Sequence, residues 1–153
     1  MNNSKSGIGR FSKLVFMMIA VGCLLLKYSH LSAQEISMHV KIHIDGRTFS
    51  ATLNDSQASR DFVAMMPLTL QLNDYAGAEK ISDLPGRLST SDSPRGSDAI
   101  KGDICLYAPW GNLAIFYKTQ SYAVGLVKLG QLDAPESFPF KANTISAVFE
   151  RAD

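Results

Sequence analysis

Aromatic side chains gather in one short segment of the chain, residues 107–117. Tyrosine and tryptophan combine an apolar ring with a hydrogen-bonding tip, which suits the wall of a ligand cleft. The same segment holds an asparagine, whose amide can orient a ligand. The sequence therefore offers five candidate ligand-binding residues: Tyr75, Tyr107, Trp110, Asn112 and Tyr117.

Strand geometry limits how many of these rings can share one surface. Consecutive side chains of a strand point to opposite faces, so Tyr107 opposes Leu106 and Phe116 opposes Tyr117. At most half of the set can then line one cleft. The alternative interpretation is that some rings belong to the core and others cover the outside of the fold.

Other reactive side chains do not form a recognisable catalytic or metal-binding pattern. His39 and His43 lie four residues apart on an expected strand, about 13 Å, which is too far to ligate one ion. Cys105 lies between Ile104 and Leu106 and is expected to be a small buried residue. The nucleophile-elbow and phosphate-loop motifs are missing from the sequence. We therefore predict no metal, no cofactor and no catalytic residue.

The N-terminal residues 1–33 have the pattern of a signal peptide. Four basic residues and no acidic one surround an apolar run from Leu14 to Leu26, which is too short for a comfortable membrane span. We expect cleavage after Ala33 and export to the periplasm or the medium. Lipidation at Cys23, which would attach the protein to the envelope, and an uncleaved anchor are the alternatives.

Removal of that segment changes the charge and the cysteine content. The whole chain of 153 residues has 15 basic and 14 acidic residues, and four of the basic ones lie in 1–33. Residues 34–153 thus carry a formal charge of −3 and one cysteine, Cys105, so an internal disulfide cannot form. Their number suits one domain, and their charge argues against nucleic acid as a partner.

Alternating apolar residues and turn signals predict a mainly β domain. A helix is expected at 55–65, between the capping residues Asn54-Asp55-Ser56 and Pro67, and loops at 89–99 and 133–143. Many short strands with one helix favour a small closed antiparallel barrel of about eight strands. The expected strands are 38–44, 47–53, 68–72, 79–83, 87–88, 104–108, 113–118, 126–132 and 144–150.

Three blocks of the chain carry a family resemblance: LTLQLNDYAG at 68–77, the pairs Glu79-Lys80 and Leu84-Pro85, and GDICLYAPWGNLAIFY at 102–117. They resemble the bacterial cyclophilin-like fold proteins, and the third block is the most specific. The resemblance covers about Met38 to Glu150. It implies a small closed barrel of about eight strands with a helix at one end, in agreement with the strand pattern.

True cyclophilins are prolyl isomerases, and the resemblance implies their active arginine in a Phe-His-Arg segment after the first helix. This chain has no such triplet there. Its only arginine between Leu68 and Leu88 is Arg87. The departure argues against isomerase activity, because a fold does not carry its function with it.

Three functions are consistent with these observations. The favoured one is an exported, non-catalytic module that binds a small molecule or a peptide beside the 107–117 hairpin. The second is a divergent prolyl isomerase that uses Arg87. The third is a structural or partner-binding protein of the envelope.

Overall fold

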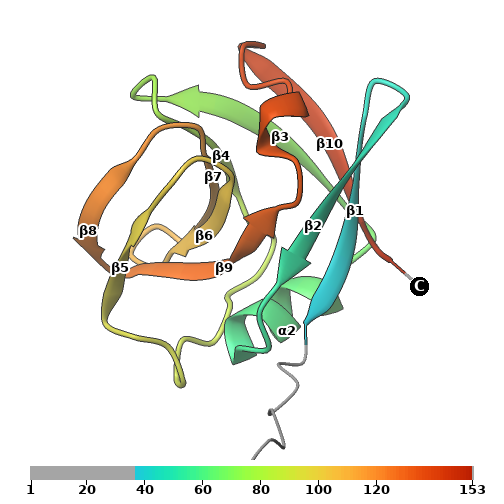
Figure 1. Cartoon of the computed structure of the whole chain (residues 1–153). Coiled ribbons are helices and arrows are strands. Elements are labelled where there is room, and N and C mark those ends of the chain that lie inside the picture. The colour runs from blue at the N-terminus through green and yellow to red at the C-terminus, as the bar shows by residue number, and fades with distance from the viewer. Residues whose placement is uncertain (1–36, 153) are drawn as a thin grey trace, which may run out of the picture. The chain divides into compact units, whose positions relative to one another are not determined.

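A closed β-barrel forms the body of the domain, in a computed structural model that describes residues 37–152 (Figure 1). Eight antiparallel strands close in the order β1-β10-β3-β4-β7-β6-β9-β2, which confirms the predicted fold class. The barrel strands are β1 Met38–Ile44, β2 Arg47–Leu53, β3 Leu68–Tyr75, β4 Glu79–Asp83, β6 Asp103–Tyr107, β7 Asn112–Phe116, β9 Leu126–Leu132 and β10 Thr144–Arg151.

The predicted signal peptide, with its cleavage and lipidation sites at Ala33 and Cys23, lies outside the described residues. Within residues 37–152, no helix has the length and apolar character needed to cross a membrane.

The first hairpin shows how the sequence pattern builds the barrel. Asp45 and Gly46 both adopt positive φ, at 48° and 75°, as the two-residue turn requires. On the strands that follow and precede it, alternate apolar residues such as Ile42 and Ala51 are fully buried. The predicted alternation of inward and outward side chains on these two strands is confirmed.

The helix α2 (Gln57–Ala64) packs into the barrel core at the end where β2 finishes (Figure 1). Its buried Phe62 contacts Phe149 edge-to-face, with 5.7 Å between the ring centroids. The prediction of a helix here is confirmed. Of the three expected capping residues, Ser56 is the N-cap, and its Oγ accepts a hydrogen bond from Ser59 N at 3.2 Å. Asn54 instead accepts from Ser56 N, and so shapes the turn before the helix.

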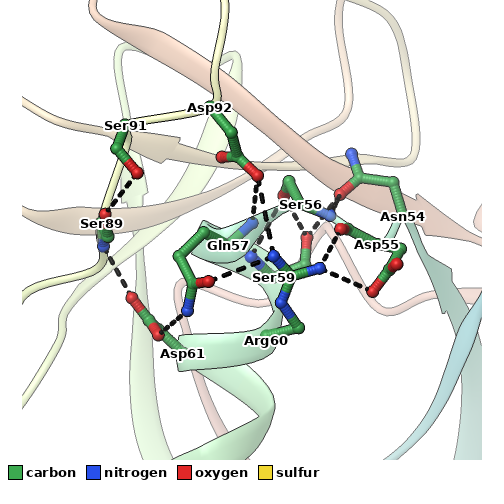
Figure 2. Close-up of polar contacts among 10 residues, drawn as sticks. All are labelled: Asn54, Asp55, Ser56, Gln57, Ser59, Arg60, Asp61, Ser89, Ser91 and Asp92. Atoms are coloured by element: carbon green, nitrogen blue, oxygen red, sulfur yellow. Dashed lines mark hydrogen bonds and ion pairs between the residues drawn. The ribbon is translucent and has the colours of Figure 1, made fainter.

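A polar network ties the loop 89–92 to the start of α2 (Figure 2). The Asp92 carboxylate accepts a hydrogen bond from Gln57 N at 2.8 Å, and Asp61 accepts one from Ser89 N at 2.8 Å. The hydrogen bond from Ser89 N is the main cause of a lowered pKa at Asp61, and the bond from the Gln57 side-chain amide is the second cause. Asp92 thus satisfies a free N–H at the start of α2, and Asp61 satisfies a backbone N–H of the loop. The network therefore has a structural role.

Two expectations about the middle of the chain are wrong. Residues 87–88 form no strand; Leu88 is buried from a loop. The expected exposed loop 89–99 contains a strand, β5 (Gly96–Ala99), which pairs with β8 (Gln120–Val124) in a separate two-stranded sheet (Figure 1). The Gly-Ser-Asp-Ala sequence of β5 has no apolar alternation, and it forms a strand because β8 is available as a partner.

This second sheet explains why β6 and β7 are buried on both faces. Their inward residues Ile104, Leu106, Leu113 and Ile115 belong to the barrel core. On the outer face, a second small core is covered by the β5–β8 sheet and contains Ala99, Cys105, Ala114, Phe116 and Leu126. The loop that leads from β9 to β10 contains its two prolines, as predicted, and one short 3-10 turn, η1 (Pro135–Ser137).

Candidate ligand-binding pocket

A pocket of about 260 Å³ opens beside the second core. Its volume lies just below the usual range for small-molecule sites, about 300–1,000 Å³, so it suits a small ligand or a single chemical group. Five barrel strands (β3, β4, β6, β7 and β9), the turn 108–111 and β8 contribute to its wall. The lining residues are Tyr75, Glu79, Tyr107, Trp110, Asn112, Phe116, Gln120, Ala123 and Leu126.

Strand register brings two rows of these residues to the same outer face. In the first row, Glu79 on β4 pairs with Tyr75 on β3 and with Phe116 on β7. In the second row, Tyr107 on β6 pairs with Asn112 on β7 and with Leu126 on β9. The residue between the rows on β7 is Ala114, whose side chain is small. Distant parts of the sequence therefore meet here through barrel closure.

Trp110 connects the two rows from the tight turn between β6 and β7. The Gly111 N–H closes this turn by donating to Tyr107 O at 2.9 Å, and Gly111 has a φ of 70°. The Trp110 ring meets Tyr75 and Tyr107 edge-to-face, with centroids 5.7 and 5.3 Å apart. Its side chain nevertheless remains exposed (60%), and Tyr75 is 41% exposed. Such exposure of large rings at a pocket mouth is typical of a binding surface.

Asn112 is the buried polar group of the pocket. It is only 3% exposed, and its Oδ1 has no hydrogen-bond partner among residues 37–152. Its Nδ2 makes one long bond, 3.4 Å, to Leu113 O. Buried polar atoms are nearly always paired, and an unpaired one loses about 1–3 kcal/mol of solvation. An acceptor in this state is well suited to receive a hydrogen bond from a ligand.

Glu79 supplies a carboxylate to the same wall. It is partly buried, and burial raises its pKa above the usual value. Within the described residues, its carboxylate belongs to none of the ion pairs. No lysine, arginine or histidine lines the pocket. The pocket is thus aromatic, carries one carboxylate and lacks a positive charge.

Four of the five candidate residues from the sequence line this pocket: Tyr75, Tyr107, Trp110 and Asn112. Tyr117 does not. It follows β7, and its ring packs against Phe140 at a centroid distance of 5.4 Å. The expectation that at most half of the set could line one cleft is therefore wrong, because Tyr75 lies on β3 and Trp110 in a turn. The sequence reasoning missed Glu79, Gln120, Ala123 and Leu126, and it did not select Phe116. Alternation along β4 and β7 places Glu79 and Phe116 on the outer faces of their strands. The pairing of the two residues depends on the register between these strands, which the sequence pattern does not give.

Tyr117 takes part in a polar triad at the end of the barrel. Its hydroxyl donates to Asp74 Oδ1 at 2.5 Å, and the ammonium group of Lys80 lies 3.1 Å from the same oxygen. Lys80 is 1% exposed and also donates to the carbonyl oxygens of Ala142 and Asn143. The triad therefore holds a buried charge and ties the loop before β10 to β4.

Asp74→Asn should lower the pKa of Tyr117. The hydrogen bond to the Asp74 carboxylate raises that pKa to about 12, and a neutral amide would let it fall toward its ordinary value, about 10. The ¹³Cζ shift of labelled tyrosine, followed against pH in the full chain, measures it. Tyr122 serves as the internal reference. An unchanged Tyr117 pKa in the variant would show that the bond to Asp74 is not its cause.

Arg87, the residue of the isomerase alternative, lines a neighbouring pocket. This second pocket is about 380 Å³ and also includes Leu84, Leu88, Ala108 and Trp110. The arginine is exposed. Trp110 therefore separates two hollows, one with a carboxylate and one with a guanidinium group.

The histidines and the cysteine form no site with other ligating residues. His43 lies between Thr48 and Glu150, at 2.9 and 3.3 Å, and His39 contacts Thr52. No group of three His, Cys, Asp or Glu residues within 37–152 is placed to hold a metal ion. Burial, with the nearby Asp103 charge, raises the pKa of Cys105 to about 12, so its thiol stays protonated at neutral pH.

A closed antiparallel barrel with an end helix and an extra two-stranded sheet defines the class of the protein. The model of the Cyclophilin-like family matches residues 42–150, and the chain belongs to this family. A solved solution structure, that of a hypothetical protein from Archaeoglobus fulgidus, shares the fold with a TM-score of 0.58 and 15% identity. The alignment covers 80% of this chain and 100% of the archaeal one. No curated protein matches the chain.

Proposed function

We propose that the protein is an exported, non-catalytic binding module that holds a small molecule or one group of a peptide in the Trp110 pocket. One observation carries the proposal: Asn112, whose buried side-chain oxygen has no hydrogen-bond partner among residues 37–152, lines an aromatic pocket. Aromatic walls with few polar groups are the usual composition of small-ligand sites. The supporting geometry comes from residues that strand pairing in this barrel brings together.

Export is part of the proposal and is supported by the sequence of residues 1–33. Cleavage after Ala33 would release the domain into the periplasm or the medium, whereas lipidation at Cys23 would hold it at the envelope. Mass spectrometry of the protein recovered from cell fractions distinguishes them. An intact N-terminus in the cytoplasmic fraction alone would contradict export.

A thermal-shift screen of small organic compounds against the full chain tests the binding function. A ligand present at about 100 times its Kd should stabilise the protein by about 2.7 kcal/mol, which is several degrees in melting temperature. Trp110→Ala and Tyr107→Ala should remove most of this shift. Tyr122→Ala is the control, because that ring is exposed and lies outside the pocket. If no compound shifts the wild type, or if Trp110→Ala keeps the full shift, the proposal is wrong.

A divergent prolyl isomerase is the second candidate function. The observation in its favour is the position of Arg87 beside Leu84, Leu88 and Trp110, an apolar hollow with a guanidinium at its edge. A proline cis/trans assay decides this. Catalysis above buffer that Arg87→Ala abolishes would support the isomerase, and a rate equal to that of buffer would reject it.

A further inference from the structure

The charge of the pocket restricts its ligand. Glu79 brings a carboxylate that has no ion-pair partner among residues 37–152, and no basic side chain lines the cavity. A partly buried carboxylate without a counter-ion is unfavourable, because desolvation is not offset by pairing. An anionic ligand would add to this cost, whereas a cation would remove it.

The aromatic residues are arranged to favour the same charge. Trp110 stands nearly perpendicular to both tyrosines, with interplanar angles of 89° to Tyr75 and 82° to Tyr107. Because Trp110 is nearly perpendicular to each tyrosine, the π faces at the mouth of the pocket point in more than one direction. A cation within about 6 Å of such a face is attracted by the ring quadrupole, and tryptophan is the strongest partner.

Asn112 adds a directional requirement. Its Oδ1 is a buried acceptor without a donor, so the matching ligand atom must carry a hydrogen. A protonated primary or secondary amine offers both the positive charge and the N–H groups. A quaternary ammonium group has the positive charge that the rings and the carboxylate attract, but it has no N–H group to donate to Asn112. A metal ion is a poorer match, because Glu79 is the only carboxylate in the lining and no His or Cys joins it.

We infer that the Trp110 pocket binds an organic ammonium ion whose N–H group is accepted by Asn112, with Glu79 as counter-ion and the aromatic rings as walls. The inference rests on the proposed binding function and names its ligand class. The ammonium group can belong to a free amine or to a lysine side chain, and the volume of about 260 Å³ accommodates such a group with a small apolar body.

Trp110 emission provides the measurement, because Trp110 is the only tryptophan of the chain. The full-length protein is titrated with cyclohexylmethylammonium, its N-trimethyl analogue, the neutral cyclohexylmethanol and the anionic cyclohexylacetate. A fifth probe, Nα-acetyl-lysine N-methylamide, presents the ammonium on a peptide unit. We expect the primary ammonium to bind at least tenfold more tightly than the alcohol, and the carboxylate to give no change in emission.

Two variants test the roles of the polar groups. Glu79→Gln should weaken the binding of both ammonium ions at least tenfold and change that of the alcohol less than twofold. Asn112→Ala should weaken the primary ammonium more than the trimethyl analogue. Glu136→Gln is the charge-matched control, since that glutamate is exposed, pairs with Lys101 and lies outside the pocket.

The outcomes separate this inference from the proposed function. Equal binding of alcohol and ammonium, or unchanged ammonium affinity in Glu79→Gln, overturns the cation inference and leaves the pocket as a binding site. Loss of every emission change, together with a failed thermal-shift screen, overturns both. Among the cations, tighter binding of the lysine derivative identifies a peptide source, and tighter binding of the free amine identifies a small molecule.

Discussion

Gly96→Ala should separate β5 from β8 and weaken ligand binding in the pocket at least tenfold while the barrel stays folded. An added Cβ at Gly96 would lie 2.3 Å from the Ala123 carbonyl oxygen and 2.9 Å from the Val124 Cα. Both contacts are with the backbone of the partner strand, so no side-chain rotation relieves them. The expected cost is about 1–3 kcal/mol, as for other overpacked sites.

The pocket depends on this pairing because β8 supplies Gln120 and Ala123 to its wall. We expect at least a tenfold loss of affinity by Trp110 emission and faster hydrogen exchange of the β8 amides. Ser121→Ala, at an exposed position of the same strand, should behave as the wild type. Gly96→Ala with native ligand affinity and native β8 protection would contradict the assigned role of the second sheet.

Phe62→Ala should produce the largest loss of global stability. Phe62 is fully buried where α2 enters the barrel core, and its ring meets Phe149 edge-to-face. Phenylalanine-to-alanine changes in cores cost about 3–5 kcal/mol, because transfer energy is lost and a cavity remains. For a domain of this size the melting temperature should fall by about 10–20 °C.

Denaturant unfolding measures this effect, and Phe62→Leu is the graded control because it keeps most of the apolar volume. It should cost less than half as much as the alanine variant. Ligand affinity, measured well below the melting temperature, should change little, since the pocket lies on the outer face of β4, β6 and β7. A cost below about 1 kcal/mol for Phe62→Ala would show that α2 does not close the core.

The barrel could be predicted from the sequence because its strands alternate clearly. Ile42 and Ala51, for example, are buried at alternate positions, and the Asp45-Gly46 pair specifies the turn between their strands. The strand β5 could not be predicted in this way. Its residues are small or polar, and it becomes a strand only because Gly96 allows close approach to β8.

The candidate site could be predicted in part for a similar reason. Trp110, Tyr107 and Asn112 lie in one local hairpin, so composition and spacing were enough to select them. Glu79 and Leu126 join them through pairing between strands that are distant in sequence. The periodicity of one strand gives its own inner and outer faces, but not its register with a neighbour. Tyr117 follows β7 and packs instead with Phe140 and Asp74.

The most direct test of the ligand site is the ¹H–¹⁵N spectrum of the full chain during titration with cyclohexylmethylammonium. We predict that the Trp110 indole N–H and the Asn112 side-chain amide resonances shift together and saturate with one dissociation constant. The amides of Gln71 and Asn143, which lie outside the pocket, should not move. The assignment of the site would be contradicted if the resonances of Trp110 and Asn112 did not shift, or if the largest chemical-shift changes were at Arg87 and Leu88.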